Sequence, residues 1–213
     1  KNIASTDIEK IQLILVFSVF FGFLGASIGS QLLIKDANVA LTTVTVIPGF
    51  CTGVLFMIFA MKLYHLNIIK WLNILVPYWC FAHGWGRIGC FLGGCCYGKP
   101  TESIFGVSFP VGSIPFHEHG YQNLHPTQIY EALILFFIGL LLLKPNFYRY
   151  RIVLFLVIYG TSRFFIEFLR DDIRGNIDFI YNLSPSQFFS IIYIFLGFLY
   201  LSTLFLNNKK STN

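Results

Sequence analysis

The chain has 213 residues, of which 12% are charged and 55% are hydrophobic, and its mean hydropathy is +0.68. Soluble domains carry roughly 25% charged residues, so the composition excludes an ordinary soluble protein and favours an integral membrane protein. The net charge of +5 comes from basic residues scattered among apolar runs, which argues against nucleic-acid binding. The five cysteines lie mostly within apolar segments and do not form the pattern of a secreted disulfide framework.

Six apolar stretches follow one another, and each is a candidate for a helix that crosses the membrane. They occupy about residues 11–34, 39–61, 71–91, 128–143, 152–169 and 183–206. A long polar loop, about residues 93–127, separates the third stretch from the fourth. The sequence therefore predicts an all-α membrane protein, a polytopic bundle of six transmembrane helices in one integral-membrane domain over residues 1–213.

The basic residues are divided unequally between alternate loops. One side of a six-helix threading holds Lys1, Lys10, Lys62, Lys70, Lys144, Arg149, Arg151, Lys209 and Lys210. The opposite side holds Lys35, Lys99, Arg170 and Arg174. Because cytoplasmic loops are enriched in Lys and Arg, we expect both termini of this chain in the cytoplasm, the long loop outside, and any site toward the outer leaflet.

The segment HGWGRIGCFLGGCCYGKPT, residues 83–101, carries one arginine, Arg87, which lies late in an otherwise uncharged run from Trp71 to Gly98. A cation at membrane depth is costly and normally marks a functional site. Gly89 and Gly94 on either side of Cys90 allow a ligand to approach closely, although close helix packing is the competing interpretation. For Gly25–Gly29 and Gly49–Gly53, spaced four apart, we expect packing. The segment around Arg87 indicates an anion-binding pocket.

A second polar group lies in YGTSRFFIEFLRDDIR, residues 159–174. Tyr159, Arg163, Glu167 and Arg170 are spaced four, four and three apart, which places them on one helix face. One interpretation is a structural ion pair between Arg163 and Glu167. The other is a guanidinium that Glu167 holds toward an anion, since arginine donates two parallel hydrogen bonds to a phosphate.

A third group lies in HPTQIYE, residues 125–131, where Pro126 is expected to open a helix and Thr127 or His125 to cap it. Besides capping, His125 is a candidate proton acceptor or headgroup contact near the membrane surface. Gln128 and Glu131 share a helix face, with Tyr130 at the interface. A buried Glu131 paired with an arginine is equally a structural device.

A metal site is one possible role for the cysteines of this segment, Cys90, Cys95 and Cys96, together with His83 or a histidine of the loop. The spacing C-x4-C-C does not match the usual zinc patterns, so we expect no metal ligand here. A disulfide between Cys95 and Cys96 would form a strained ring, which leaves a long-range redox partner as another alternative. The simplest interpretation is that these are small residues in a packed site.

Taken together, GRIGCFLGGCCYG, HPTQIYEA and YGTSRFFIEFLRDD resemble the bacterial prolipoprotein diacylglyceryl transferases, particularly their cysteine-containing branch. The resemblance extends to Gly25–Gly29 and to Ser184 and Gln187. That family moves the diacylglyceryl group of phosphatidylglycerol to the thiol of a lipobox cysteine in a secreted preprotein. The resemblance therefore implies a transferase of the bacterial cytoplasmic membrane, acting in lipoprotein biosynthesis among membrane lipids, without a cofactor.

By this resemblance, Arg87 and Arg163 match the family's two essential arginines and would bind the phosphate. Glu167 matches the glutamate that follows the second arginine, and His125 is our candidate for the catalytic base. The substrate-binding positions implied by the resemblance and by the patterns above are Gly89, Cys90, Gly94, Gln128, Tyr130, Glu131, Tyr159 and Arg170.

The chain also departs from the family pattern. The family has seven spans, so the first is expected to precede Lys1. Its histidine-glycine-glycine element here reads Ile47-Pro48-Gly49-Phe50, and the asparagine and glutamate of its arginine motif are Cys90 and Cys95. These changes keep three alternatives open: a membrane transferase with another lipid or acceptor, a non-catalytic lipid-binding membrane protein, and a thiol-redox or metal-binding membrane protein.

Overall fold

The structure is a computed structural model that describes residues 5–33, 46–171 and 183–211. The chain divides into two compact units, Lys1–Trp71 and Leu72–Asn213. Three of the positions on which the predicted orientation depends lie outside the described residues, namely Lys1, Lys35 and Arg174. The start of the second predicted stretch, residues 39–45, also lies outside them.

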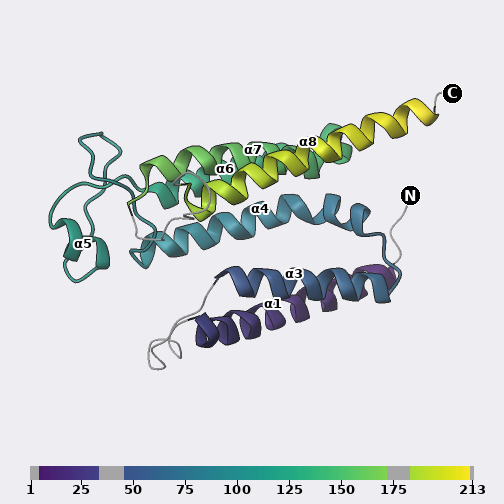
Figure 1. The fold of residues 1–213 in the computed structure, drawn as a ribbon, viewed down its shortest axis with the longest axis horizontal. Coiled ribbons are helices and arrows are strands. Elements are labelled where there is room, and N and C mark those ends of the chain that lie inside the picture. The colour runs from purple at the N-terminus through teal and green to yellow at the C-terminus, as the bar shows by residue number, and fades with distance from the viewer. Residues whose placement is uncertain (1–4, 34–45, 172–182, 212–213) are drawn as a thin grey trace. The chain divides into compact units, whose positions relative to one another are not determined.

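The first unit is a pair of helices, α1 (Ser5–Leu33) and α3 (Val46–Leu63), which lie side by side in Figure 1. Glycines allow the close approach. A methyl group on Gly49 would lie 2.7 Å from the Ala26 Cβ, and one on Gly53 would lie 2.9 Å from the Ser18 carbonyl oxygen. A methyl group on Gly25 would overlap the Thr52 side chain. The predicted packing role of these glycines is confirmed.

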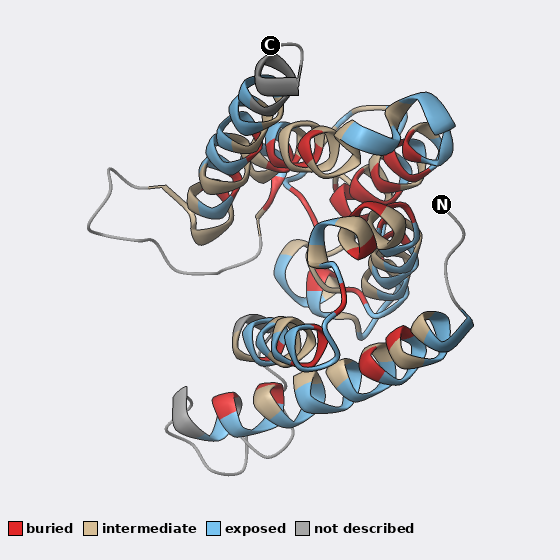
Figure 2. Cartoon of the chain, turned by 90° about the vertical axis from the view of Figure 1, so that its right-hand side faces the viewer, coloured by how far each residue is buried: buried red, intermediate tan, exposed pale blue. Residues whose placement is uncertain are grey.

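The second unit holds the other long helices: α6 (Thr127–Leu143), α7 (Arg151–Ile166), α8 (Pro185–Ser211) and most of α4 (Ile68–Leu92). Short 3-10 helices lie before and after α7: η1 (Pro145–Tyr150) and η2 (Glu167–Leu169). Figure 2 colours the buried residues red, and in this unit they include residues of α4, α6, α7 and α8. The core is formed by Cys80, Leu135, Ile138, Leu142 and Tyr159, with Phe81 of α4 packed 3.0 Å from the position of a methyl group on Gly139.

The outer surface of the helices is apolar, as expected for a protein surrounded by lipid. Leu13, Val16 and Phe23 of α1 are 60%, 65% and 67% exposed. Within the described residues, three helices are long and apolar enough to cross a membrane, namely Ser5–Gly29, Pro145–Leu169 and Pro185–Leu206. Pro48–Leu63 and Thr127–Leu143 are shorter apolar helices. The prediction of an all-α membrane protein is confirmed: the described residues form helices and isolated bridges, without a strand.

The predicted polar loop is ordered. It contains a short helix, α5 (Ile114–His119), which the sequence pattern did not predict, and isolated bridges that join Gly98 to Arg170 and Val107 to Leu124. Tyr97, Phe109 and Leu124 form a small apolar core within it. The bridge to Arg170 fixes the loop against the end of α7 and so brings the cysteine segment to the helix bundle.

Candidate active site

Glu131 lies at the centre of the site. It is on the second turn of α6 and only 1% exposed. Its Oε1 accepts a hydrogen bond of 2.9 Å from the hydroxyl of Tyr159 on α7 and lies 3.0 Å from Nη2 of Arg87 on α4. Nε of Arg163 is 3.8 Å from the same oxygen. A buried carboxylate is costly unless it is paired, and here groups from two neighbouring helices pair with it.

The predicted helix face is present only in part: Tyr159 and Arg163 lie on α7, whereas Glu167 begins η2 and Arg170 follows η2 in an extended conformation. The predicted ion pair between Arg163 and Glu167 is confirmed. Nη1 of Arg163 lies 2.6 Å from Oε2 of Glu167, and Nη2 donates a hydrogen bond of 2.7 Å to the hydroxyl of Ser186. The Nε of Arg170 lies 3.9 Å from the same oxygen of Glu167. Ser186 was missed by the sequence analysis, since a serine in the first turn of a helix carries no pattern that points to an arginine. Arg163 is thus held from α6, η2 and α8 together.

We call Arg87, Glu131, Arg163, Glu167 and Arg170 the ionic cluster. Its three guanidinium groups outnumber its two carboxylates, so it keeps one positive charge. Among the described residues, the buried Nε of Arg87 has no hydrogen-bond acceptor and the buried Oε2 of Glu131 has no donor. An unsatisfied buried donor is costly, and an anionic ligand with several oxygens would both satisfy it and neutralise the charge.

Two buried side chains at the start of α6 hold the cysteine segment. The hydroxyl of Thr127 donates to the Cys96 carbonyl oxygen at 2.6 Å, and Nε2 of Gln128 donates to the Cys95 carbonyl oxygen at 2.5 Å. The prediction that Thr127 or His125 caps this helix is wrong, because Pro126 is at the N-cap and no side chain makes a capping hydrogen bond. The Thr127 hydroxyl instead joins two segments of the site.

The three cysteines of the arginine segment gather at one point. Gly94 and Cys96 both have positive φ, +65° in each case, so the chain turns back on the end of α4. The sulfur atoms of Cys90, Cys95 and Cys96 lie within 4.8 Å of one another, and all three are thiols. Nη1 of Arg87 is 3.9 Å from the Cys96 sulfur. Burial, followed by the neighbouring Cys96 thiol, raises the pKa of Cys95.

Gly89 lies beside this turn in open space. A methyl group there would meet no atom of the residues that the structure describes within 4 Å. Helix packing therefore does not require a glycine at this position. This observation favours the interpretation that the backbone is left bare for a ligand.

His125 and Tyr130 lie together, with Nδ1 of His125 3.2 Å from the Tyr130 hydroxyl oxygen. The backbone of His125 pairs with Gly98 and Lys99 of the loop. In the described part of the chain, neither side chain makes a hydrogen bond or ion pair with the ionic cluster. The structure thus brings these two predicted site residues to the edge of the loop, where the backbone of Gly98 pairs with both His125 and Arg170.

His83 was missed as a member of the site. Its ring lies edge-on to Tyr159, 5.5 Å between centroids, and its Nε2 is 4.0 Å from Oε1 of Glu131. The buried Nδ1 has no hydrogen-bond partner among the described residues. The sequence did hold a signal, because His83 precedes Arg87 by four residues and therefore shares its helix face.

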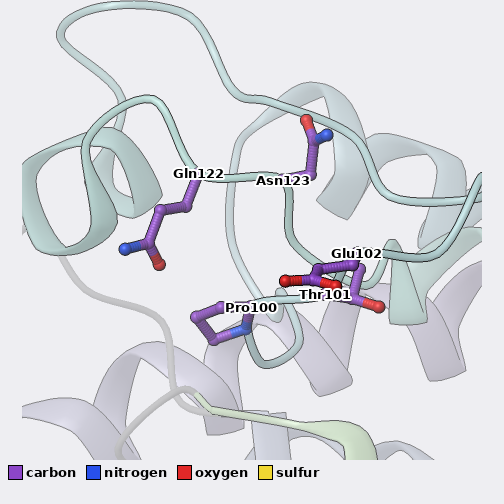
Figure 3. Close-up of a pocket in the computed structure, with 5 residues that line it drawn as sticks. All are labelled: Pro100, Thr101, Glu102, Gln122 and Asn123. Carbon is purple, nitrogen blue, oxygen red and sulfur yellow. The ribbon is translucent and has the colours of Figure 1, made fainter.

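A separate pocket of about 470 Å³ lies in the loop (Figure 3). It is open and lined by Pro100, Thr101, Glu102, Gln122 and Asn123, none of which belongs to the ionic cluster. Thr101 and Asn123 come from segments paired through a backbone hydrogen bond of 2.8 Å, so the two walls are fixed relative to each other.

The sequence model of a family described as "Prolipoprotein diacylglyceryl transferase" matches residues 1–203. A protein of Clostridium tetani named phosphatidylglycerol–prolipoprotein diacylglyceryl transferase is 43% identical over 62% of this chain and 52% of its own length. One of Clostridium perfringens is 38% identical over 68% of this chain and 56% of its own length, and one of Francisella tularensis is 33% identical over 76% and 61%.

These relatives are therefore matched over little more than half of their length. The family match nevertheless covers nearly the whole of this chain, including the arginine segment, the start of α6 and the stripe on α7. The chain belongs to the prolipoprotein diacylglyceryl transferase family.

Proposed function

We propose that the protein transfers the diacylglyceryl group of phosphatidylglycerol to the thiol of a lipobox cysteine in a secreted preprotein. The observation that carries the proposal is the net positive ionic cluster inside an apolar helix bundle. A buried excess of guanidinium groups suits a lipid phosphate, and relatives of this chain carry this activity in their names.

In the proposed reaction the cysteine sulfur attacks the glyceryl carbon, and the bond between that carbon and the phosphate oxygen breaks. Glycerol 1-phosphate leaves. Arg87 and Arg163 hold the phosphate and stabilise the charge that develops on its oxygens as the bond breaks. Glu131 and Glu167 position the two guanidinium groups, and Ser186 fixes the second one.

The remaining members of the site contact the substrate in this proposal. They include Arg170, which lies beside Glu167, and Tyr159, which donates a hydrogen bond to Glu131. Gly89 leaves room for the glyceryl backbone next to Cys90. The other proposed contacts are Gly94, Gln128, Glu131 and Tyr130. No metal and no organic cofactor takes part in this reaction.

A free thiol has a pKa near 8.5, so a base or a cationic environment must favour the thiolate. The family resemblance proposes His125 as the proton acceptor, and the geometry offers His83, which adjoins the ionic cluster. His83→Gln and His125→Gln distinguish them. The variant that lacks the base should lose the acidic limb of the pH–rate profile and keep its affinity for lipid.

We further propose that the chain forms one integral-membrane domain of six spans, with both termini in the cytoplasm and the ionic cluster toward the outer leaflet. The shorter apolar helices α3 and α6 and the helix α4 would then cross with the three long ones. The loop and its pocket would face outward, where secreted preproteins arrive.

The experiment that tests this function is transfer in reconstituted vesicles. Protein in vesicles of phosphatidylglycerol should modify a lipobox peptide at its cysteine, and a Cys→Ser peptide should remain unmodified. Arg163→Ala should abolish transfer, whereas Arg149→Ala, an exposed arginine on η1, should not. Transfer from phosphatidylethanolamine instead would identify a different donor, and lipid binding without transfer would indicate a non-catalytic protein.

A further inference from the structure

Cys90, Cys95 and Cys96 form a preorganised group of three sulfur atoms. Cys90 is in the last turn of α4, and the other two follow the turn at Gly94. The backbone of Cys95 and Cys96 is held from α6 by hydrogen bonds from Gln128 and Thr127. The sulfur atoms therefore lie together because two helices fix the segment that carries them, and the three residues are thiols rather than partners in a disulfide.

The spacing of the sulfur atoms suits a single soft metal ion. Thiolate sulfur binds zinc at about 2.3 Å, so two sulfurs on one ion lie at most about 4.6 Å apart and about 3.8 Å apart in a tetrahedral site. The three sulfurs lie within 4.8 Å of one another. Side-chain rotations that move each sulfur by less than about 1 Å would therefore complete the set. The spacing of the cysteines in the sequence does not reveal that the three sulfur atoms lie together, because it does not show the turn at Gly94.

We propose that Cys90, Cys95 and Cys96 bind one soft divalent metal ion through three thiolates, and that the occupied site inhibits the transferase. Soft thiolate ligands select ions such as zinc and cadmium over magnesium or calcium. Each thiol releases its proton on binding, so one divalent ion and three thiols give a complex of charge −1 and three protons. The inhibitory half of the proposal rests on the proposed function, and the binding half does not.

Inhibition follows from the position of Arg87. Its Nη1 lies 3.9 Å from the Cys96 sulfur, and its Nη2 lies 3.0 Å from Glu131. A metal–thiolate complex would place a negative charge beside the guanidinium that is proposed to bind the lipid phosphate. The phosphate would then compete with an anion already in contact with Arg87, so its affinity should fall.

The test uses the whole chain, purified in detergent, reduced and stripped of metal, with cadmium as the probe. Cadmium–thiolate charge-transfer absorbance should rise to saturation at one ion per chain. Cys95→Ser with Cys96→Ser should weaken cadmium binding by more than roughly 100-fold, since even outer-shell changes at metal sites cost 10–100-fold. Cys51→Ser, a cysteine of α3 outside the group, is the matched control and should bind as the wild type does.

A second arm measures transfer with the same samples. Cadmium or zinc at one equivalent should inhibit the wild type, and the double serine variant should keep both its basal transfer and its activity in the presence of metal. If the double variant unfolds at a lower temperature than the wild type, Cys95→Ser alone is used, with an expected loss of affinity of at least roughly tenfold.

The outcomes separate the two claims. Cadmium binding by the double variant with wild-type affinity and stoichiometry would overturn the metal site. Stoichiometric binding with unchanged transfer would overturn the inhibition alone. Stoichiometric binding in a protein without any transfer activity would support the metal site and contradict the proposed function.

Discussion

Arg87 contacts two parts of the site, the carboxylate of Glu131 and the sulfur of Cys96. Arg87→Lys keeps the charge and loses the planar group that donates two parallel hydrogen bonds. We expect the transition state for transfer to lose about 2.7–4 kcal/mol of stabilisation, the cost of removing one hydrogen-bond donor from such a site. The measurement is kcat/KM for a lipobox peptide in vesicles, with Lys62→Arg as a control outside the ionic cluster. A wild-type rate in a folded Arg87→Lys variant would make Arg87 a structural residue.

Arg163 and Glu167 allow the structural and catalytic interpretations of an ion pair to be separated. Glu167→Gln should reduce turnover in part, because the amide oxygen still accepts a hydrogen bond from Arg163. Arg163→Ala should be worse, since it removes a phosphate contact and takes from the buried Glu167 its nearer partner, 2.6 Å away, leaving only Arg170 at 3.9 Å among the described ion pairs. Breaking a buried ion pair costs about 3–5 kcal/mol. Thermal unfolding in detergent and transfer are measured on the same samples. If replacing both residues with leucine restored stability and transfer together, the catalytic role of Arg163 would be lost.

At the scale of elements, the start of α6 connects the helix bundle to the cysteine segment. Thr127→Val keeps the shape of the side chain and removes the donor to the Cys96 carbonyl oxygen. We expect a loss of about 1–3 kcal/mol in the free energy of unfolding, because a buried acceptor loses its donor. Cys95 and Cys96 should then react faster with a maleimide. Thr161→Val on the exposed face of α7 is the control, and equal effects in the two variants would contradict the anchoring role.

The sequence predicted the positions of the long helices well, because each is a long apolar stretch that charged or polar residues interrupt at its ends. Where boundaries differed, the cause is local: α1 begins at Ser5 and includes Asp7, Glu9 and Lys10, since charged side chains are tolerated in the first two turns, where none of these three residues is buried. The short helix α5 was missed, since six residues are too few to show a period.

The ionic cluster could be predicted only in part. Helix periodicity placed Arg163 next to Glu167, because the two are four residues apart where α7 continues directly into η2. The pairing of Glu131 with Arg87 joins two helices, and a single sequence does not contain the register between them. The same holds for Ser186 and for the gathering of the three cysteines, each of which depends on contacts between segments.

For the whole molecule, the central spatial claim is the proposed topology. Single cysteines introduced at Ser113, in the loop, and at Asn146, on η1, should differ in labelling by a probe that does not cross the membrane. The first should react from outside the cell, and the second only after the membrane is opened, because the basic residues near η1 favour the cytoplasm. The labelling is done in a variant in which the native cysteines are serine. The reverse pattern would move the site to the inner leaflet.

The most direct test of the account is the transfer itself, measured by mass spectrometry of a lipobox peptide incubated with the wild type and with Arg163→Ala in phosphatidylglycerol vesicles. We expect the wild type to add one diacylglyceryl group to the peptide cysteine and to release one glycerol 1-phosphate. We expect no such product from Arg163→Ala when that variant is inserted and folded. An unmodified peptide with the wild type, or equal modification by both proteins, would contradict the claim that the ionic cluster carries out this transfer.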